Sequence, residues 1–380
     1  MEKLLCLIEE KQPEMLEFLE QLVNIDSGCD NPEGIKQAAG FIGAKLEQIG
    51  FMVEYLDYPG ICCHVKGVRP GTGPEQVMVI GHLDTLFPKG TAQKRPFTIK
   101  DGKAYGPGVL DMKGGITVAL FALQSLIESG WNDKNVTVLF CGDEEIAHPR
   151  TDAAERFEQE ARGKKAVFNM ETASIGENVL IGRKGNLFCE IEVKGISAHA
   201  GADLDKGANA VTELANKVLQ INKLNDPARG LTFNVGVISG GTVANAVPDR
   251  ATLQIDVRYL TQEDKQRASD GLQKIAERVD VPGTKTTITT LWEKFTPMEA
   301  CDENKKLFEI VRQQGEKLGL TIEGKIGGGA SDSGWTVRAG APSICAMGAI
   351  GEFNHSDREY IFVDSLVKRA KLLAMSIDAV

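Results

Sequence analysis

Two almost continuously apolar runs constrain the fold of this 380-residue chain most: residues 76–81 (QVMVIG) and 136–141 (VTVLFC). Strands of that kind belong to sheets that are covered on both faces, because a half-exposed strand would alternate between polar and apolar residues. Residues 166–170 repeat the pattern, and apolar residues at helical spacing over 35–49 and 116–127 supply covering helices. We therefore expect α/β architecture, a mixed sheet flanked by helices, with functional residues at the carboxyl ends of strands.

A second domain is indicated by a change of pattern at about Arg183. From there the chain predicts the order β-α-β-β-α-β, which is self-contained and typical of a ferredoxin-like α+β fold. A chain of 380 residues is also longer than a single hydrophobic core usually serves. We expect one domain built from 1–182 and 296–380, with 183–295 inserted into it as the ferredoxin-like domain.

Composition excludes several classes of partner. The net charge of -10 argues against nucleic-acid binding, which needs clustered Lys and Arg to neutralise phosphates. The N-terminus, MEKLLCLIEEKQPEML, is acidic and amphipathic and does not resemble a signal peptide, and we expect no apolar run of the roughly 20 residues that span a bilayer. Eight scattered cysteines are more consistent with buried reduced thiols than with disulfides, which predicts a cytoplasmic protein without membrane contact.

Histidine and acidic residues follow the predicted strands. They are His82 and Asp84 in GHLDT, Asp111 in GPGVLDMKGG, Glu144 and Glu145 in CGDEE, Glu171 after AVFNM, and His355 in NHSDREY. Imidazole and carboxylate groups together suit Zn²⁺. Four carboxylates and two histidines are too many for one tetrahedral ion, but they suit two ions with one bridging carboxylate and one carboxylate left as a base. Asp84 is placed to orient the His82 ring from behind.

Each of these residues also has an ordinary interpretation. A pair of glutamates after a strand is commonly a solvated loop, and an Asp before a helix is commonly an N-cap. The run Asp143–Glu145 ends an apolar strand, where desolvated like charges repel unless a cation is present. We interpret His148 as a surface residue, and His64, which falls inside a predicted strand, as a structural one.

The motifs GHLDT, GPGxxDMKGG, DEE, SAHAG, NAVPD followed by DVRY, GGGASD and HSDxEY occur in the order found in the M20 metallopeptidase family. The chain resembles that family over most of its length, and the glutamate carboxypeptidase branch looks most similar. The resemblance implies a zinc-peptidase catalytic domain, an inserted dimerisation (lid) domain, and two Zn²⁺ per chain, with Co²⁺ or Mn²⁺ as possible substitutes. It also implies cleavage of an amide or peptide bond next to a free carboxylate.

The resemblance also implies a role for each residue of the predicted zinc site. Asp111 would bridge the two ions, His82 and Glu171 would complete one site, Glu145 and His355 would complete the other, Glu144 would be the general base, and Asp84 would support His82. A cis peptide bond is expected between Asp111 and Met112.

On the substrate side, the family pattern assigns His199 in SAHAG and Asn245 in NAVPD to the partner's active site in a homodimer. Arg258 in DVRY matches a carboxylate-binding arginine of related desuccinylases, although by itself it reads as an exposed charge on an alternating strand. Gly328 and Gly329 would let the backbone approach a ligand closely, or they form only a tight turn.

The chain departs from the family pattern at two places. After CGDEE it reads IAHPRTDA instead of a small Gly/Ser-rich stretch, and Lys294 stands near the place where the carboxypeptidase branch has an arginine. Lysine lacks the bidentate fork of arginine. Our leading hypothesis is a metallocarboxypeptidase that releases a C-terminal amino acid such as glutamate from a small peptide. An N-acyl-amino-acid deacylase and a dipeptidase are alternatives, and a non-catalytic binding or scaffold member is a further one, which loss of a ligand or of Glu144 would have indicated.

Overall fold

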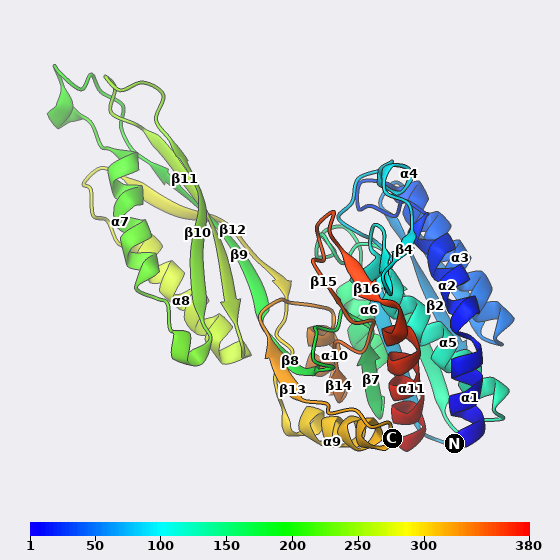
Figure 1. The fold of residues 1–380 in the computed structure, drawn as a ribbon. Coiled ribbons are helices and arrows are strands. Elements are labelled where there is room, and N and C mark those ends of the chain that lie inside the picture. Colours follow the sequence, from blue (N-terminus) through cyan, green and yellow to red (C-terminus); the bar gives the residue numbers. More distant parts are fainter. The chain divides into compact units, whose positions relative to one another are not determined.

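The computed structural model describes residues 1–380, and contacts divide the chain into two compact units. Unit 1 consists of Met1–Gly182, Ala300–Gly327 and Ser331–Val380. Unit 2 consists of Arg183–Glu299 and Gly328–Ala330. Figure 1 labels the elements of both units.

A six-stranded mixed sheet forms the centre of unit 1, in the order β1-β2-β6-β3-β7-β14. The strands are β1 (Met52–Tyr58), β2 (Cys62–Arg69), β6 (Asn135–Cys141), β3 (Gln76–His82), β7 (Ala166–Asn169) and β14 (Ser343–Ile344). The last four run parallel to one another, and β1 and β2 are antiparallel. Val77 and Val79 of β3 join one buried cluster while Met78 and Ile80 join another, so both faces of the sheet are covered. The expected mixed α/β sheet is confirmed.

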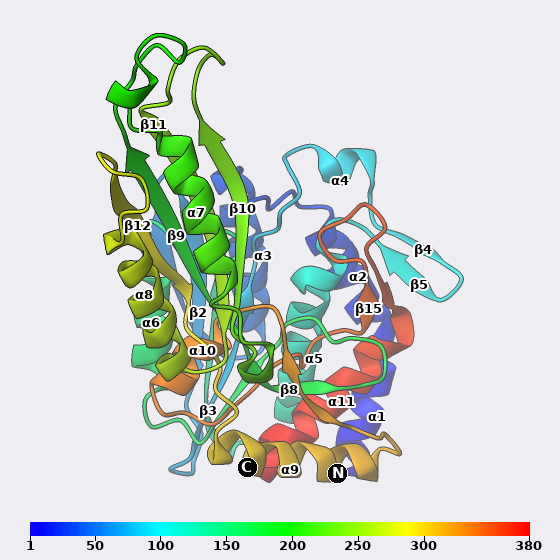
Figure 2. The ribbon, with the colours of Figure 1, turned by 90° about the vertical axis from the view of Figure 1, so that its left-hand side faces the viewer.

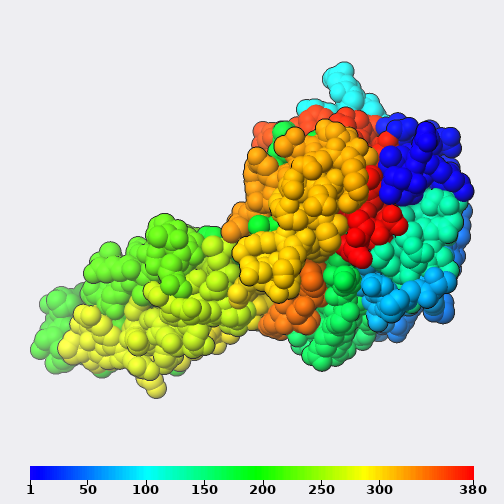
Figure 3. Space-filling view, turned by 90° about the horizontal axis from the view of Figure 1, so that it is seen from below, coloured from blue at the N-terminus to red at the C-terminus, as the bar shows by residue number.

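Helices surround this sheet (Figure 2). They are α1 (Glu2–Glu10), α2 (Gln12–Val23), α3 (Pro32–Gln48), α4 (Thr91–Lys94), α5 (Gly114–Glu128), α6 (Ala153–Ala161), α9 (Asp302–Lys317), α10 (Ser333–Arg338) and α11 (Val363–Ala379). α1 and α11, the two terminal helices, pack against each other and against α5, and Figure 3 shows them side by side on one face of unit 1. Short strands complete unit 1: β4 (Thr98–Lys100), β5 (Lys103–Tyr105), β16 (Tyr360–Phe362) and β15 (Gly351–Glu352) form one sheet, and β8 (Val179–Arg183), whose last residue belongs to unit 2, pairs with β13 (Gly324–Gly327).

The central helix α5 corrects one expectation. The stretch Val109–Glu128, which joins α5 to the short π-helical segment Val109–Lys113, is 20 residues long, and its most apolar window has a mean hydropathy of 1.3, enough by length and composition to cross a membrane. Within the protein 94% of its most apolar window is buried, as is typical of a helix that is hydrophobic on all sides because it lies in a core. The eight cysteines are free thiols, and five of them are buried.

Unit 2 contains a four-stranded antiparallel sheet in the order β10-β11-β9-β12. Its elements are β9 (Gly185–Lys194), α7 (Ala210–Asn222), β10 (Thr232–Gly240), β11 (Arg250–Tyr259), α8 (Gln262–Glu277) and β12 (Lys285–Phe295), with short 3₁₀ turns at Leu204–Lys206 and Pro227–Arg229. α7 and α8 pack against each other and cover one face of the sheet (Figures 1 and 2). The predicted ferredoxin-like order is confirmed, and Thr261 caps α8 by accepting a hydrogen bond from the backbone N–H of Asp264.

Candidate metal centre

Three neighbouring parallel strands bring most of the predicted site to one edge of the sheet. β3 lies between β6 and β7, with His82 paired to Cys141 and Ile80 paired to Asn169. His82 is the last residue of β3, while Glu144 and Glu171 follow the ends of β6 and β7. Because the carboxyl ends of parallel strands meet at the same edge, these side chains converge.

One cluster of possible metal ligands consists of His82, Asp111 and Glu171, all of which are buried. His82 Nε2 lies 3.1 Å from Asp111 Oδ1 and 3.8 Å from Glu171 Oε1. Two ligand atoms about 2.0–2.2 Å from a shared tetrahedral ion lie roughly 3.3–3.6 Å apart, and the two distances in this cluster fall just below and just above that range.

A second cluster consists of Asp111, Glu145 and His355. His355 Nε2 lies 3.0 Å from Asp111 Oδ2 and 3.4 Å from Glu145 Oε2. Asp111 therefore presents one oxygen to each histidine, which is the arrangement of a carboxylate that bridges two ions. The donor set of imidazole nitrogens and carboxylate oxygens fits a pair of zinc ions.

The buried carboxylates of this site need a nearby positive charge if they are all to be ionised. Burial raises the pKa of Glu144 well above its ordinary value, and Glu171 adds to the shift against the opposing effect of His82. Burial also raises the pKa of Glu145, followed by the charge of Asp111. For Asp111 burial acts in the same direction, but hydrogen bonds from His355 and His82 hold its pKa below the usual range. Positive charge among these carboxylates would allow all of them to be ionised together.

Asp84 supports the site from behind. Its backbone carbonyl lies 3.0 Å from His82 Nδ1, and its carboxylate Oδ1 lies 3.4 Å from the same nitrogen. The carboxylate also accepts hydrogen bonds from the backbone N–H groups of Glu144 and Glu145, at 3.2 and 3.0 Å. A single buried carboxylate thus orients both the His82 ring and the turn that carries the glutamates.

The turn around Asp111 is held by a residue to which sequence reasoning gave no role. The peptide bond Asp111–Met112 is cis, as expected from the family pattern. The buried carboxylate of Glu359 accepts three backbone hydrogen bonds of 2.9 Å, from Gly108, Leu110 and Asp111. The only signal for Glu359 in the sequence is its place in HSDREY, four residues after His355.

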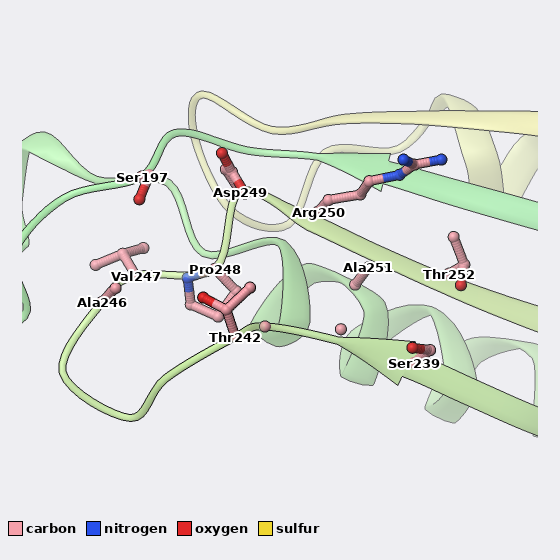
Figure 4. A pocket seen from close by; sticks show the side chains of 12 residues that line it. Ser197, Ser239, Thr242, Ala246, Val247, Pro248, Asp249, Arg250, Ala251 and Thr252 are labelled. Atoms are coloured by element: carbon pink, nitrogen blue, oxygen red, sulfur yellow. The ribbon is translucent and has the colours of Figure 1, made fainter.

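His199 and Asn245 lie on adjoining loops of unit 2. Ala200 donates its backbone N–H to the carbonyl of Asn245, and both predicted residues are exposed. His199 Nδ1 accepts hydrogen bonds from two backbone N–H groups, so the ring proton resides on Nε2, where it is available to a ligand. A cavity of about 380 Å³ lies beside these loops, lined by Ser197, Thr242 and Ala246 among others (Figure 4).

The other predicted substrate residues of unit 2 already have protein partners. Arg258 forms an ion pair with Asp256, with Nε 2.7 Å from the carboxylate. The Lys294 ammonium lies over the rings of Phe188 and Trp292, 5.2 and 5.5 Å from their centroids. The glycine pair is exposed: an added Cβ at Gly328 would meet nothing, and the Gly329 carbonyl accepts a hydrogen bond from Arg183.

The interpretation of His148 as a surface residue is wrong. Its side chain is buried, and its ring lies between the carboxylates of Asp143 and Asp332. Sequence reasoning missed this because Asp332 is distant in the chain and the loop IAHPRTDA carries no apolar pattern. His64 lies in β2 and is completely buried, and its Nδ1 accepts the backbone N–H of Gly142, which suits a structural residue.

Comparisons with known proteins agree with this geometry. The model of peptidase family M20/M25/M40 matches residues 78–379. Carboxypeptidase G2 from Pseudomonas sp. (strain RS-16) is 33% identical over 379 residues, which cover 97% of this chain and 89% of that protein. Acetylornithine deacetylase from Proteus mirabilis is 26% identical over 342 residues, covering 81% of this chain and 83% of the other.

Solved structures share the fold. An aminopeptidase, PepT, from Bacillus cereus superimposes with a TM-score of 0.83 at 20% identity, covering 97% of this chain and 98% of that one. A metallo-carboxypeptidase of the M20 family from Sulfolobus solfataricus gives a TM-score of 0.75 at 18% identity, covering 96% and 99%. At such identities the likeness concerns the fold and leaves the substrate open.

Proposed function

This chain belongs to peptidase family M20/M25/M40, and we propose on that basis that it is a two-zinc carboxypeptidase. It would cleave the amide bond next to a free carboxylate and release a C-terminal amino acid such as glutamate. The observation that carries the proposal is the position of Asp111, whose two oxygens face His82 and His355 separately. Residues 1–182 and 296–380 would form the catalytic domain, and 183–295 the dimerisation domain.

The proposed ligands are His82, Asp111 and Glu171 for one ion, and Asp111, Glu145 and His355 for the other. When bound, a zinc pair supplies a water of lowered pKa and polarises the scissile carbonyl. Co²⁺ or Mn²⁺ would fit the same nitrogen and oxygen donors.

The protein's own groups then move the protons. Glu144 lies in the same turn as Glu145 but belongs to neither ligand cluster, so its carboxylate is left to act as a base. It would accept a proton from the attacking water and return it to the leaving nitrogen. Asp84 would fix the positions of both glutamates through the hydrogen bonds that its carboxylate accepts from their backbone N–H groups.

His199 would stabilise the tetrahedral transition state. Its Nε2–H is exposed and its orientation is fixed by the two N–H groups on Nδ1. A donor aimed at the developing oxyanion contributes about 3 kcal/mol in comparable sites. Asn245, on the adjoining loop, and Arg258 would bind the substrate, together with the backbone of Gly328 and Gly329.

A deacylase acting on N-acyl amino acids is the second candidate, because acetylornithine deacetylase and succinyl-diaminopimelate desuccinylases align over most of the chain at 24–27% identity. Both activities cut an amide beside a carboxylate and differ in what lies on the acyl side.

Lys294 stands near the place where the carboxypeptidase branch has an arginine. A lysine would bind a substrate carboxylate as a point charge, whereas an arginine binds it through two hydrogen bonds, so we expect weaker discrimination among C-terminal side chains.

The proposal is tested by metal analysis and by a paired substrate panel. After dialysis in zinc and removal of excess metal, we expect about two ions per chain, with fewer in His82→Ala and His355→Ala. The panel contains peptides ending in glutamate and other residues, N-acetyl and N-succinyl amino acids, and the C-terminally amidated form of each as a control. Hydrolysis should require the free carboxylate. Fewer than one ion per chain, unchanged by His82→Ala, would rule out the metal centre, and equal cleavage of amidated compounds would rule out the substrate class.

A further inference from the structure

A second cluster of polar side chains lies behind the metal centre and takes no part in it. His148 Nδ1 is 2.8 Å from Asp143 Oδ1, and its Nε2 is 2.7 Å from Asp332 Oδ1. All three side chains are only 2% exposed. Carboxylate oxygens of ionised aspartates only accept hydrogen bonds, so both ring nitrogens must donate and the imidazole carries a positive charge.

The remaining oxygens of the two aspartates are also satisfied. Asp143 Oδ2 accepts a hydrogen bond from the Thr151 hydroxyl at 2.7 Å, and Asp332 Oδ2 lies 3.3 Å from the Cys141 sulfur. Burial alone would lower the pKa of His148, but Asp332 and Asp143 raise it well above the ordinary value. The cluster is therefore a buried, hydrogen-bonded ion network of the kind that fixes one local conformation.

The network joins two segments that matter for the proposed reaction. On one side, Asp143 directly precedes Glu144, and the turn is closed by backbone hydrogen bonds from His148 to Asp143 and from Ala147 to Glu144, of 3.1 and 2.7 Å. Ala147 and His148 both have left-handed backbones, with φ of 64° and 54°, which non-glycine residues rarely adopt without support. On the other side, Asp332 immediately precedes α10 and follows the segment Gly328–Ala330.

We propose that His148 is a positioning residue that fixes the orientation of Glu144 and Glu145. Its doubly bonded ring ties their turn, through Asp143, to Asp332 at the start of α10. The turn is then held from two sides, by Asp84 on its backbone N–H groups and by His148 through Asp143. His148 itself touches neither metal nor substrate. This role rests on the proposed function, because positioning matters only if the two glutamates bind metal and move protons.

The same atoms do not suit a third metal ion. Cys141, His148 and Asp332 lie close enough to be considered as ligands. However, the nitrogen-to-oxygen distances of 2.7 and 2.8 Å are those of hydrogen bonds, and a ring whose two nitrogens both donate has no lone pair left to bind a metal.

The test combines one substitution that breaks the hydrogen-bond network with a second substitution that restores it. His148→Gln keeps nearly the same length but can donate to only one aspartate, leaving an amide oxygen against the other carboxylate. Adding Asp332→Asn turns that clash into a hydrogen bond between two amides, while the new glutamine still donates to Asp143. Groups that hold metal ligands from behind affect activity or metal affinity by about 10- to 100-fold. We expect a loss of that size in kcat, and about 10-fold weaker zinc binding in chelator competition, for the single variant, with most of both regained in the double variant.

His64→Gln is the matched control. His64 is equally buried and lies near the same aspartate, but its Nε2 is 3.9 Å from Asp143 Oδ1, beyond hydrogen-bond distance. The hydrogen bond that His64 Nδ1 accepts from the Gly142 N–H can be accepted by the glutamine oxygen instead, so we expect that variant to keep its kcat and its zinc affinity. If His148→Gln does not fold, Asp332→Ala removes the other end of the link, leaves room for a water molecule and should show the same losses.

Three outcomes would overturn the proposal: unchanged kcat and zinc affinity in a folded His148→Gln variant, equal losses in the single and double variants, or the loss of a third bound ion. A lowered melting temperature with normal kcat and zinc affinity would likewise reduce His148 to a structural role. If the wild type hydrolyses nothing in the panel, the proposed function fails, and zinc affinity, measured without substrate, still decides whether His148 positions the turn.

Discussion

Glu144 and Glu145 are adjacent in the sequence and receive the same support from Asp84, yet their side chains have different surroundings. Glu145 faces His355, while Glu144 lies outside both ligand clusters. Glu144→Gln should therefore reduce kcat by at least about 10²-fold, because the amide cannot accept the proton of the attacking water. Zinc content should stay at the wild-type value, which is measured on the same preparation.

The matched control is Glu155→Gln, a change of an exposed carboxylate in the first turn of α6 that belongs to neither ligand cluster. It should leave both kcat and zinc content unaltered. Near-normal turnover in Glu144→Gln would mean that the base is misassigned and would make Glu145 the next candidate. Loss of zinc together with turnover would mean that Glu144 is a ligand.

A second residue-scale prediction concerns pH. Burial lowers the pKa of His64 to about 4, against the opposing charge of Asp143 and with His148 acting in the same direction as burial. The unfolded chain takes up this proton near pH 6.5, so between pH 4 and 6.5 the unfolded state binds more protons. The contribution of His64 to the free energy of unfolding should therefore rise with pH across this window, by about 3 kcal/mol between pH 4 and pH 6.5.

Comparing the wild type with His64→Gln isolates this contribution, because the zinc ligands and the other titrating groups are common to both proteins. Denaturant unfolding at several pH values should show a smaller loss of stability on acidification in the variant. Parallel curves for the two proteins would show that His64 is not held neutral in the native state.

At the scale of elements, the start of α5 packs closely against Met170, which follows β7 and directly precedes Glu171. A Cβ added at Gly115, in the first turn of α5, would lie 1.9 Å from the backbone oxygen of Met170, whereas one at Gly40 in α3 would meet nothing. Backbone cannot yield as a flexible side chain can. Gly115→Ala should cost about 3 kcal/mol of unfolding free energy, and Gly40→Ala should add up to about 1 kcal/mol, as alanine does in a helix.

Thermal or denaturant unfolding of the two variants measures the difference. Both changes add one methyl group to a helix, so helix propensity alone predicts stabilisation in both. Opposite signs would show that contact with Met170, and not helix propensity, decides the outcome at Gly115. Equal stabilisation would mean that α5 and the segment after β7 separate easily.

The sequence predicted those elements, and indicated those candidate ligands, whose signals are local. Continuous apolar runs identified β3 and β6, alternation identified the sheet of unit 2, and polar residues directly after strands indicated His82 and Glu171. The positions of His148 and Glu359 could not be predicted, because each depends on a partner more than a hundred residues away. The apolar spacing over 116–127 identified α5, but it gave no sign of the short π-helical segment Val109–Lys113 before it, where the backbone is non-helical at Asp111 and Met112.

At the scale of the whole molecule, unit 2 places its predicted substrate residues far apart. Arg258 lies near the end of β11 and Asn245 lies five residues before its start. Arg250 and Arg258 are about 27 Å apart along a strand that rises about 3.4 Å per residue. Within one chain, a small substrate cannot contact both Asn245 and Arg258. The two residues can serve the same active site only if they come from different subunits, which favours the predicted homodimer.

His199 shares the loop pair of Asn245 and should therefore act in the partner's site. His199→Ala should lower kcat strongly with zinc still bound, because the oxyanion loses a donor worth about 3 kcal/mol.

Mixing this variant with Glu144→Gln under conditions that exchange subunits shows whether His199 acts in its own chain or in the partner's site. If His199 acts across the dimer, each mixed dimer contains one intact site and one site that lacks both groups. With random exchange of equal amounts, half of the dimers are mixed, and activity should return to about a quarter of the wild-type value. If His199 acts within its own chain, both sites of a mixed dimer are damaged and no activity returns. Sedimentation of the mixture, with one variant fluorescently labelled, verifies that subunits have exchanged.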